Sequence, residues 1–281
     1  MEDYKYKIVH AVKDHTVSNQ TFGLYHDEKT DMLVTFPRPK PENLDFFYES
    51  KEYISHTDSN FNLFDKVYQI VKSYTLKSKI NLIKKHHAGV GNILDIGCGT
   101  GDFLVAAQKS SWQTTGVETN IKAKLLAENK NITVLETSHN LENQSLDIIT
   151  MWHVLEHVYD VDAQISELKR LLKPNGTIII AVPNYKSFDA KFYGRHWAAF
   201  DVPRHLSHFS KSSIKIIFER QGMFVKKIIP MRFDSFYVSL LSEKHKTGSI
   251  NINGLWIGLK SNWKARKSKQ FSSQIYVIKV K

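Results

Sequence analysis

A regular alternation of strand and helix signals between residues 92 and 182 is the feature that most limits what this chain can fold into. The expected strands are short apolar segments, and the expected helices carry apolar residues at helical spacing. The strands are predicted at 93–96, 113–118, 132–136, 146–152 and 177–182, and the helices between them at 103–108, 121–128 and 161–172. Alternation of this kind indicates βαβ units, so we predict an α/β fold built on a doubly wound parallel sheet.

The flanking segments extend this core on both sides. A strand pair at 22–25 and 32–36 precedes a proline-containing linker, and a long helix is expected from 63 to 87. Beyond the break that follows Pro183, the pattern predicts a helix at 214–220, a strand at 224–229, a helix at 236–241 and a last, antiparallel strand at 274–280. The predicted organisation is an N-terminal β-hairpin with a Tyr-rich cap (1–60), a core (61–183), an aromatic lid (184–209) and a C-terminal completion of the sheet with a basic face (210–281).

The basic charge of the chain is concentrated at its C-terminal end. The 281 residues carry a net charge of +11, and the last 81 residues alone hold 16 Lys and Arg against 4 Asp and Glu. Such a face can attract a nucleic acid, an anionic lipid surface or a phosphorylated small molecule, or it can serve only as a solvated surface. Cys98 is the only cysteine, which excludes an internal disulfide and a thiolate zinc cluster. No apolar stretch is long enough to cross a bilayer and the first residues are charged, so we predict a cytoplasmic protein without a membrane span.

A glycine-rich turn follows the first strand of the core. It reads Asp95-Ile96-Gly97-Cys98-Gly99-Thr100-Gly101 and leads into a helix. Glycine there permits positive φ and lets a ligand approach the backbone, while the helix start offers free N–H groups. Glu118 ends the second strand, 21 residues past Gly97, where a carboxylate reaches the hydroxyls of an adenosine ribose. The glycines run Gly-x-Gly-x-Gly instead of the dinucleotide Gly-x-Gly-x-x-Gly. We predict a ligand site at this turn, and the alternative is a purely structural tight turn.

Three motifs in order resemble those of the class I S-adenosylmethionine-dependent methyltransferases. They are 93–101, the fourth-strand motif at 146–149 with 153–158, and the turn at 172–177. The resemblance implies a Rossmann-like fold and S-adenosylmethionine as cofactor, with the glycines at the methionine half, Asp95 beneath it, Glu118 on the ribose and 151–153 as a wall of the cleft. The cofactor-binding residues that it implies are Asp95, Gly97, Cys98, Gly99, Gly101, Glu118, Thr119, Met151, Trp152 and His153. In place of the Asp with which many members bind adenine, this chain has Glu136-Thr137-Ser138-His139.

Two histidines and a carboxylate lie close together after the fourth strand. Read alone, His153-Val154-Leu155-Glu156-His157 matches a zinc-peptidase pattern, but its place after a buried strand argues against that class. It also resembles the Glu-x-x-Glu-His motif of ubiquinone-biosynthesis O-methyltransferases, which is associated with a divalent metal. In this chain His153 replaces the first carboxylate of that motif. Because hard cations prefer oxygen ligands, we predict no metal here. The cluster either fixes the loop by hydrogen bonds or supplies a general base. The catalytic candidates are His157, His205 and Glu156.

The segment after the fifth strand is rich in aromatic rings. Residues 185–209 hold seven of them, a density of 28% against 12% in the whole chain. The segment either covers the cleft as a substrate lid or forms a small core of its own. Its Asp-x-Pro-x-His element at 201–205 resembles one found in a subset of these methyltransferases, often near sugar or polysaccharide pathways. In that subset the N-terminal region is often a small zinc ribbon with paired cysteines, and those cysteines are absent from this chain. The substrate-binding candidates are Tyr53, Trp197, Arg204 and His208.

These observations predict an S-adenosylmethionine-dependent methyltransferase. The acceptor is expected to be a small or carrier-linked molecule, with sugars and quinone-like compounds as candidates, and neither its identity nor the oligomeric state follows from the sequence. The alternatives are an RNA- or protein-directed methyltransferase that uses the basic face, a non-catalytic cofactor-binding protein, and a nicotinamide dehydrogenase. We do not expect a nucleic acid partner, because no RNA-binding module is recognisable.

Overall fold

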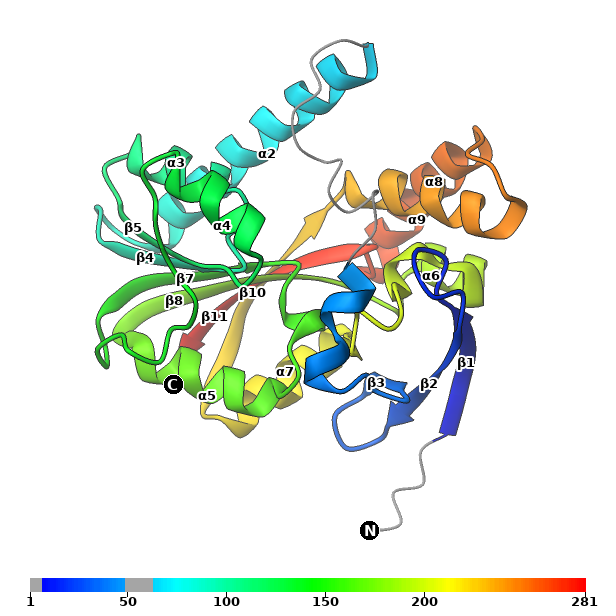
Figure 1. Cartoon of the computed structure of the whole chain (residues 1–281), viewed down its shortest axis with the longest axis horizontal. Coiled ribbons are helices and arrows are strands. Elements are labelled where there is room, and N and C mark those ends of the chain that lie inside the picture. Colours follow the sequence, from blue (N-terminus) through cyan, green and yellow to red (C-terminus); the bar gives the residue numbers. More distant parts are fainter. Residues whose placement is uncertain (1–6, 49–62) are drawn as a thin grey trace.

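The computed structural model describes residues 7–48 and 63–281, and a twisted seven-stranded sheet runs through its centre (Figure 1). The strand order is β10-β11-β8-β7-β4-β5-β6, and the four pairs between β8 and β6 are parallel. The parallel strands are β4 (Asn92–Ile96), β5 (Gln113–Val117), β6 (Thr133–Leu135), β7 (Leu146–Trp152) and β8 (Leu172–Pro183). The predicted Rossmann-like α/β sheet is confirmed.

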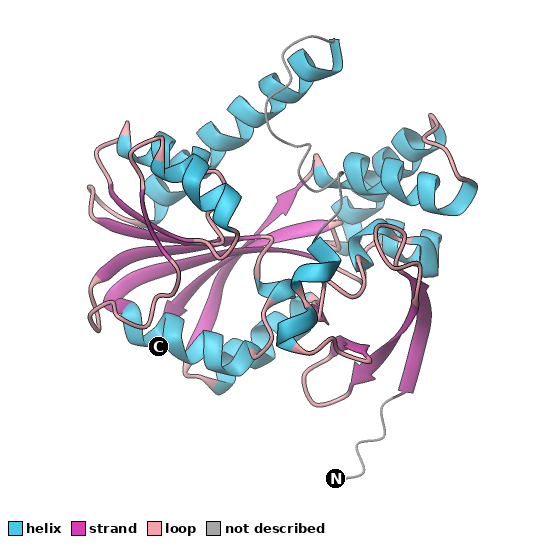
Figure 2. Cartoon of the chain, in the orientation of Figure 1, coloured by secondary structure: helices cyan, strands magenta, loops and turns pink. Residues whose placement is uncertain are grey.

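Helices cover both faces of this sheet, because neighbouring residues of each central strand point to opposite sides. Ile148 packs in a core with α2 (Leu63–His86), α3 (Asp102–Gln108) and α4 (Ile121–Glu128). The next residue, Ile149, packs in a second core with α5 (Val161–Leu171) and α7 (Lys211–Arg220). Figure 2 shows these two helical layers above and below the magenta strands. The apolar run of β7 is therefore explained by burial on both faces.

The C-terminal strand joins the sheet in the predicted antiparallel direction. β11 (Ser273–Val280) lies between β8 and β10 (Met223–Met231) and is antiparallel to both. A helical hairpin precedes it, formed by α8 (Asp234–Thr247) and α9 (Asn253–Ser268). The sequence predicted only a short helix at 236–241 and none at α9. In the described residues, no helix combines the length and the apolar character that a bilayer crossing needs.

A second, four-stranded antiparallel sheet combines the N-terminal region with the aromatic segment 184–209. Its order is β1-β2-β3-β9, with β1 (Lys7–Lys13), β2 (Thr21–Asp27), β3 (Met32–Phe36) and β9 (Ser207–His208). β2 and β3 form the predicted hairpin. β9 comes from the aromatic segment, so residues 184–209 pack with the N-terminal region. The remaining short elements are η1 (Pro41–Asn43), η2 (Asp45–Tyr48), η3 (Leu155–His157), α6 (Phe188–Tyr193), η4 (Gly194–His196) and η5 (Ala198–Phe200).

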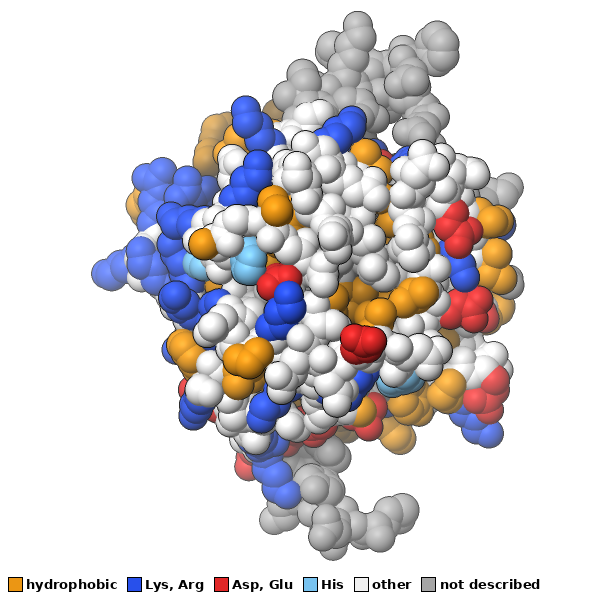
Figure 3. Space-filling view, turned by 90° about the vertical axis from the view of Figure 1, so that its left-hand side faces the viewer, with side chains coloured by type: hydrophobic (Ala, Val, Ile, Leu, Met, Phe, Trp, Pro, Cys, Tyr) orange, Lys and Arg blue, Asp and Glu red, His pale blue; other side chains and the backbone are white. Residues whose placement is uncertain are grey.

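The C-terminal basic charge falls on two separate surfaces. One surrounds the end of α2, where burial and the charges of Lys226, Lys227 and Lys279 lower the pKa of His86. Figure 3 shows Lys and Arg side chains gathered on this side of the molecule. The other surface belongs to the α8–α9 hairpin, at the opposite side of Figure 1.

Candidate active site

The glycine turn leaves a bare stretch of backbone at the carboxyl end of β4. Gly97, Gly99 and Gly101 all have a positive φ, of 69°, 54° and 78°, which residues with a side chain adopt only with strain. A Cβ on Gly97 would collide with Val154, whereas a Cβ on Gly99 would meet no atom of residues 7–48 and 63–281 within 4 Å. The backbone at Gly99 therefore borders open space in which a ligand can approach it.

Glu118 lies against this turn, as the sequence predicts. Its carboxylate accepts a hydrogen bond from the Gly99 N–H at 2.8 Å and another from the Asn120 N–H at 2.8 Å. The carboxylate is half-buried, and the neighbouring Thr119 is exposed. Cys98, in contrast, is directed into the protein, where its sulfur packs against Gly116. Burial and the charges of Asp95 and Glu118 raise the pKa of the Cys98 thiol to about 12, so it stays protonated at neutral pH.

Asp95 is enclosed beneath the turn, in a charged environment. Thr150 donates a hydrogen bond of 2.6 Å to its carboxylate. Burial raises the pKa of Asp95 to about 7, against the effect of that hydrogen bond and of the Lys79 charge. Burial also lowers the pKa of Lys79 to about 8, against the charges of Asp95 and Asp234. A carboxyl group that is close to half ionised at neutral pH can respond to a cationic ligand.

Met151 and Trp152, of the predicted wall at 151–153, pack against the two cores on opposite faces of the sheet. Met151 is fully buried in the core with α5 and α7. Trp152 contacts Phe103 edge-on, with ring centroids 5.6 Å apart, and its indole N–H is buried without a hydrogen-bond partner. The ammonium of Lys79 lies 4.1 Å from the centre of the Trp152 ring, a cation–π contact. Strand alternation explains the division, because consecutive β7 residues face opposite sides.

His153 joins two carboxylates from different elements. Its Nδ1 lies 3.3 Å from Glu156 Oε1 and its Nε2 lies 3.1 Å from Asp234 Oδ2. Burial opposes the charged form of His153, but the interactions with Asp234 and Glu156 outweigh it and raise the pKa to about 10. The residue also has a positive φ of 59°, an uncommon conformation outside glycine. His153 is thus a cation at neutral pH.

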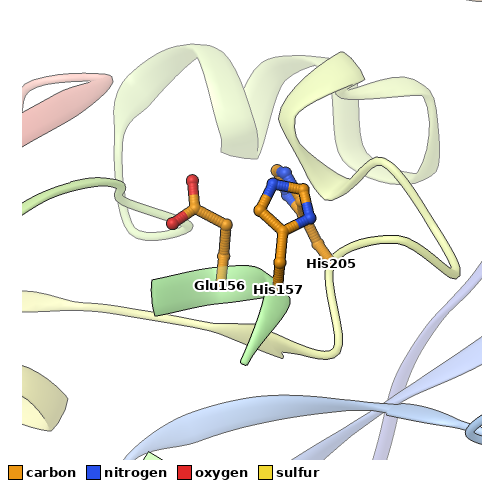
Figure 4. Close-up of side chains that lie close together, drawn as sticks. All are labelled: Glu156, His157 and His205. Atoms are coloured by element: carbon orange, nitrogen blue, oxygen red, sulfur yellow. The ribbon is translucent and has the colours of Figure 1, made fainter. Parts of the chain in front are cut away.

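Glu156, His157 and His205 come together beside it (Figure 4). His157 Nδ1 lies 3.1 Å from the Arg204 carbonyl and 3.0 Å from the Tyr48 hydroxyl; His205 Nδ1 lies 2.9 Å from the Ala199 carbonyl. A carbonyl only accepts, so each Nδ1 carries a proton, and Nε2 is the nitrogen that can take up a second one; the Nε2 of His205 also lies 4.0 Å from Asp201 Oδ2. Burial and the neighbouring His205 lower the pKa of His157 to about 4, so its ring is neutral at pH 7.

These three side chains are also the group that fits a metal ion best in the described residues. One ligand atom from each lies within 4.8 Å of the others. Both Glu156 oxygens are buried without a hydrogen-bond partner, although His153 provides a compensating charge. Two nitrogens and one oxygen suit Zn²⁺ or Fe²⁺ better than Mg²⁺, which prefers oxygen ligands. The sequence analysis named these same three residues as catalytic candidates, but it predicted no metal at them.

The substrate-binding candidates of the aromatic segment are occupied by interior contacts. Trp197 is 1% exposed and donates a hydrogen bond of 2.8 Å to Asp189, and His208 Nε2 lies 3.0 Å from the Thr35 hydroxyl. Arg204 is 2% exposed and binds Asp201, Asp14, Thr16 and the Phe47 carbonyl. Tyr193, Trp197 and Phe200 of this segment form a third core with the N-terminal sheet. We therefore correct the prediction that Arg204 faces the acceptor. Tyr53 lies outside the described residues.

Two residues of the site, Lys79 and Asp234, were not predicted, whereas Tyr48 belongs to the predicted Tyr-rich cap. Tyr48 reaches His157, Asp234 reaches His153, and Lys79 lies over Trp152. A signal existed only for Lys79: it lies on the face of α2 that also carries Leu76 and the buried Ile83, so a charge interrupts an apolar stripe. Tyr48 and Asp234 reach the cleft through tertiary packing that no local pattern encodes.

Comparison with known proteins agrees with this geometry. A family model described as a methyltransferase domain matches residues 68–226. The ubiquinone biosynthesis O-methyltransferase of Rickettsia typhi is 29% identical over 177 residues, which are 57% of this chain and 70% of that protein. The protein of the same name from Rhodopseudomonas palustris strain TIE-1 is 31% identical over 129 residues, 42% of this chain and 51% of the relative. The chain thus spans about half the length of several curated relatives that it matches.

Solved structures show the same fold. A SAM-dependent methyltransferase from Thermotoga maritima has a TM-score of 0.54 at 18% identity, covering 78% of this chain and 96% of its own. Geranyl diphosphate C-methyltransferase from Streptomyces coelicolor has a TM-score of 0.57 at 12% identity, and the match covers 86% of this chain and 99% of that protein. That structure was solved with Mg²⁺, geranyl diphosphate and S-adenosyl-L-homocysteine. Because the family model covers more than half of the chain, we conclude that the protein belongs to the methyltransferase-domain family and uses S-adenosylmethionine as its methyl donor.

Proposed function

We propose that this methyltransferase methylates a hydroxyl oxygen of a small, quinone-like acceptor, with the imidazoles of His157 and His205 as proton acceptors. The observation that carries the proposal is the pair of imidazoles whose Nδ1 protons are both engaged by carbonyls. Their Nε2 atoms suit removal of a proton from a phenolic hydroxyl. The name of the relatives, ubiquinone biosynthesis O-methyltransferase, supports an acceptor of this class.

Two observations support binding of the cofactor at the glycine turn. The space beside Gly99 is open, and Glu118 already accepts hydrogen bonds at this backbone. We propose that Glu118 binds the ribose hydroxyls and that Asp95 interacts with the cationic methionine half. When bound, S-adenosylmethionine supplies an activated methyl group. The task of the chain is then to align the acceptor oxygen and to exclude water.

The carboxylate of Glu156 supports the two proposed bases. It is 1% exposed; burial opposes its ionised form, but the interaction with protonated His153 outweighs burial and lowers the pKa of Glu156. When an imidazole takes a proton, this carboxylate stabilises the resulting imidazolium. His157 is held by the Arg204 carbonyl and by the Tyr48 hydroxyl, so its ring orientation is fixed before the acceptor arrives. We propose that Arg204 acts only through this positioning contact.

The test is a methyl-transfer assay with a panel of catechols, other phenols, sugars and carrier-linked acceptors. We expect turnover with catechols, and loss of about 10²–10⁴-fold in kcat for His157→Ala or His205→Ala. Binding of S-adenosylhomocysteine by calorimetry should be unchanged in both variants. His139→Ala is the matched control, because His139 is an exposed histidine whose recorded ion pair is with Glu167. Turnover of sugars but no phenol, or full kcat in both variants, would contradict the proposal.

A further inference from the structure

The helix α9 is packed with its small residues inward. The buried members are Gly254, Gly258, Ser261 and Ala265, which recur at helical spacing and form one face. A Cβ on Gly254 would lie 2.7 Å from the Leu240 Cα, so the backbones of α8 and α9 are in close contact. This packing places the large apolar residues of α9 on the outside.

The outward face is unusually apolar for a surface. Trp256 and Trp263 are 64% and 65% exposed. Further exposed apolar side chains on α9 and on the preceding connection are Ile250, Ile252, Leu255 and Leu259. Single exposed apolar residues are ordinary, but a patch of six on one hairpin indicates an interaction surface.

Cations surround this patch, and the sequence contains no Asp or Glu after Glu243. A pocket of about 590 Å³ opens on the same face, where Arg232, Lys260 and Arg266 lie beside the two tryptophans. Within the described part of the chain, none of these three cations forms an ion pair with an Asp or Glu. The pocket therefore combines apolar walls with uncompensated positive charge.

We propose that the α8–α9 hairpin docks on the surface of an anionic phospholipid bilayer, with Trp256 and Trp263 in the interface and Arg232, Lys260 and Arg266 on lipid phosphates. Tryptophan prefers the boundary between water and hydrocarbon, and long basic side chains keep their charge at the headgroups. Exposed aliphatic residues gain little from a nucleic acid, and a second copy of this face would oppose like charges. The hairpin thus fits a membrane surface without crossing it.

The test is flotation of the full chain with vesicles of phosphatidylglycerol and phosphatidylcholine, compared with pure phosphatidylcholine. We expect at least about tenfold stronger binding to the anionic vesicles, weakened by salt, with quenching of tryptophan fluorescence by brominated lipid. Trp256→Ser combined with Trp263→Ser, and separately Lys260→Gln combined with Arg266→Gln, should each weaken binding at least about tenfold.

Two controls keep the result interpretable. Lys226→Gln combined with Lys227→Gln removes the same charge from the other basic surface and should leave vesicle binding unchanged. Calorimetry with S-adenosylhomocysteine checks that every variant is folded. Vesicle binding needs no acceptor, so its failure is distinct from failure of the proposed methyl transfer. Absence of anionic-vesicle binding, an equal loss in the control, or a dimer or RNA complex abolished by the same tryptophan changes would overturn the proposal.

Discussion

Replacing Arg204 with Met should destabilise the fold without affecting the chemistry of acceptor recognition. The guanidinium is 2% exposed and is bound to Asp201 through Nε at 3.0 Å, to Asp14 at 3.2 Å and to Thr16 at 2.9 Å. Methionine would fill most of the volume but leave two carboxylates without their cation. Breaking a buried ion pair in this way costs about 3–5 kcal/mol. Because Asp201 is 29% exposed, we expect about 3 kcal/mol.

Thermal unfolding measures this loss. For a chain of this size, about 3 kcal/mol corresponds to a decrease in Tm of about 6–12 °C. Arg195→Met is the matched control: its recorded side-chain contact is with the neighbouring His196, so its Tm should change by less than about 2 °C. In the assay, the KM of Arg204→Met for the acceptor should stay within about twofold of the parent at a temperature where both are folded. An unchanged Tm together with a large increase in KM would refute the structural role and restore Arg204 as a substrate ligand.

Three other outcomes are expected. Burial raises the pKa of Asp95 to about 7, and its ionised form is the one that attracts a cation. The affinity for S-adenosylmethionine, measured by calorimetry, should therefore rise about tenfold from pH 6 to pH 8. An equal dependence of affinity on pH in Asp95→Asn would contradict this. Glu118→Ala should weaken S-adenosylhomocysteine binding by about 1.5–3 kcal/mol, or about 10–150-fold, since a charged acceptor is lost, whereas Thr119→Ala should bind normally. Because His153 already compensates the Glu156 charge, EDTA dialysis should leave activity intact; activity lost with EDTA and restored by Zn²⁺ would instead assign Glu156, His157 and His205 to a metal.

The parts of the fold that sequence predicted correctly are those with a local physical cause. β7 begins and ends at the predicted residues, because a strand buried on both faces must be apolar throughout. The glycine turn and Glu118 could be paired in advance, since the ends of adjacent parallel strands meet at one edge of a sheet. In each case the pattern that identifies the element is also what stabilises it.

The errors came where contacts between distant segments decide the structure. α9 was missed because its apolar residues face outward and its small residues mark the buried side, which reverses the usual stripe. Arg204 was interpreted as a ligand because it lies in the aromatic segment expected to cover the cleft, yet Asp14, 190 positions away, pairs with it in the interior. The meeting of His205 with Glu156 likewise depends on the path of the segment 184–209, which has no regular periodicity.

The charges of the cleft explain why Asp95 can have a pKa near neutrality. The charges of Glu156 and Asp234 are balanced by protonated His153 and by Lys79, and the additional negative charge of Glu118 opposes ionisation of Asp95. An ionised Asp95 would add an uncompensated charge in an enclosed space, and burial accordingly favours its neutral form. A cation that enters the cleft reverses this balance by pairing with the carboxylate. We infer that Asp95 is ionised mainly when a cationic ligand is bound. Without the ligand the carboxyl group is largely neutral, so the cleft does not contain an unpaired buried charge.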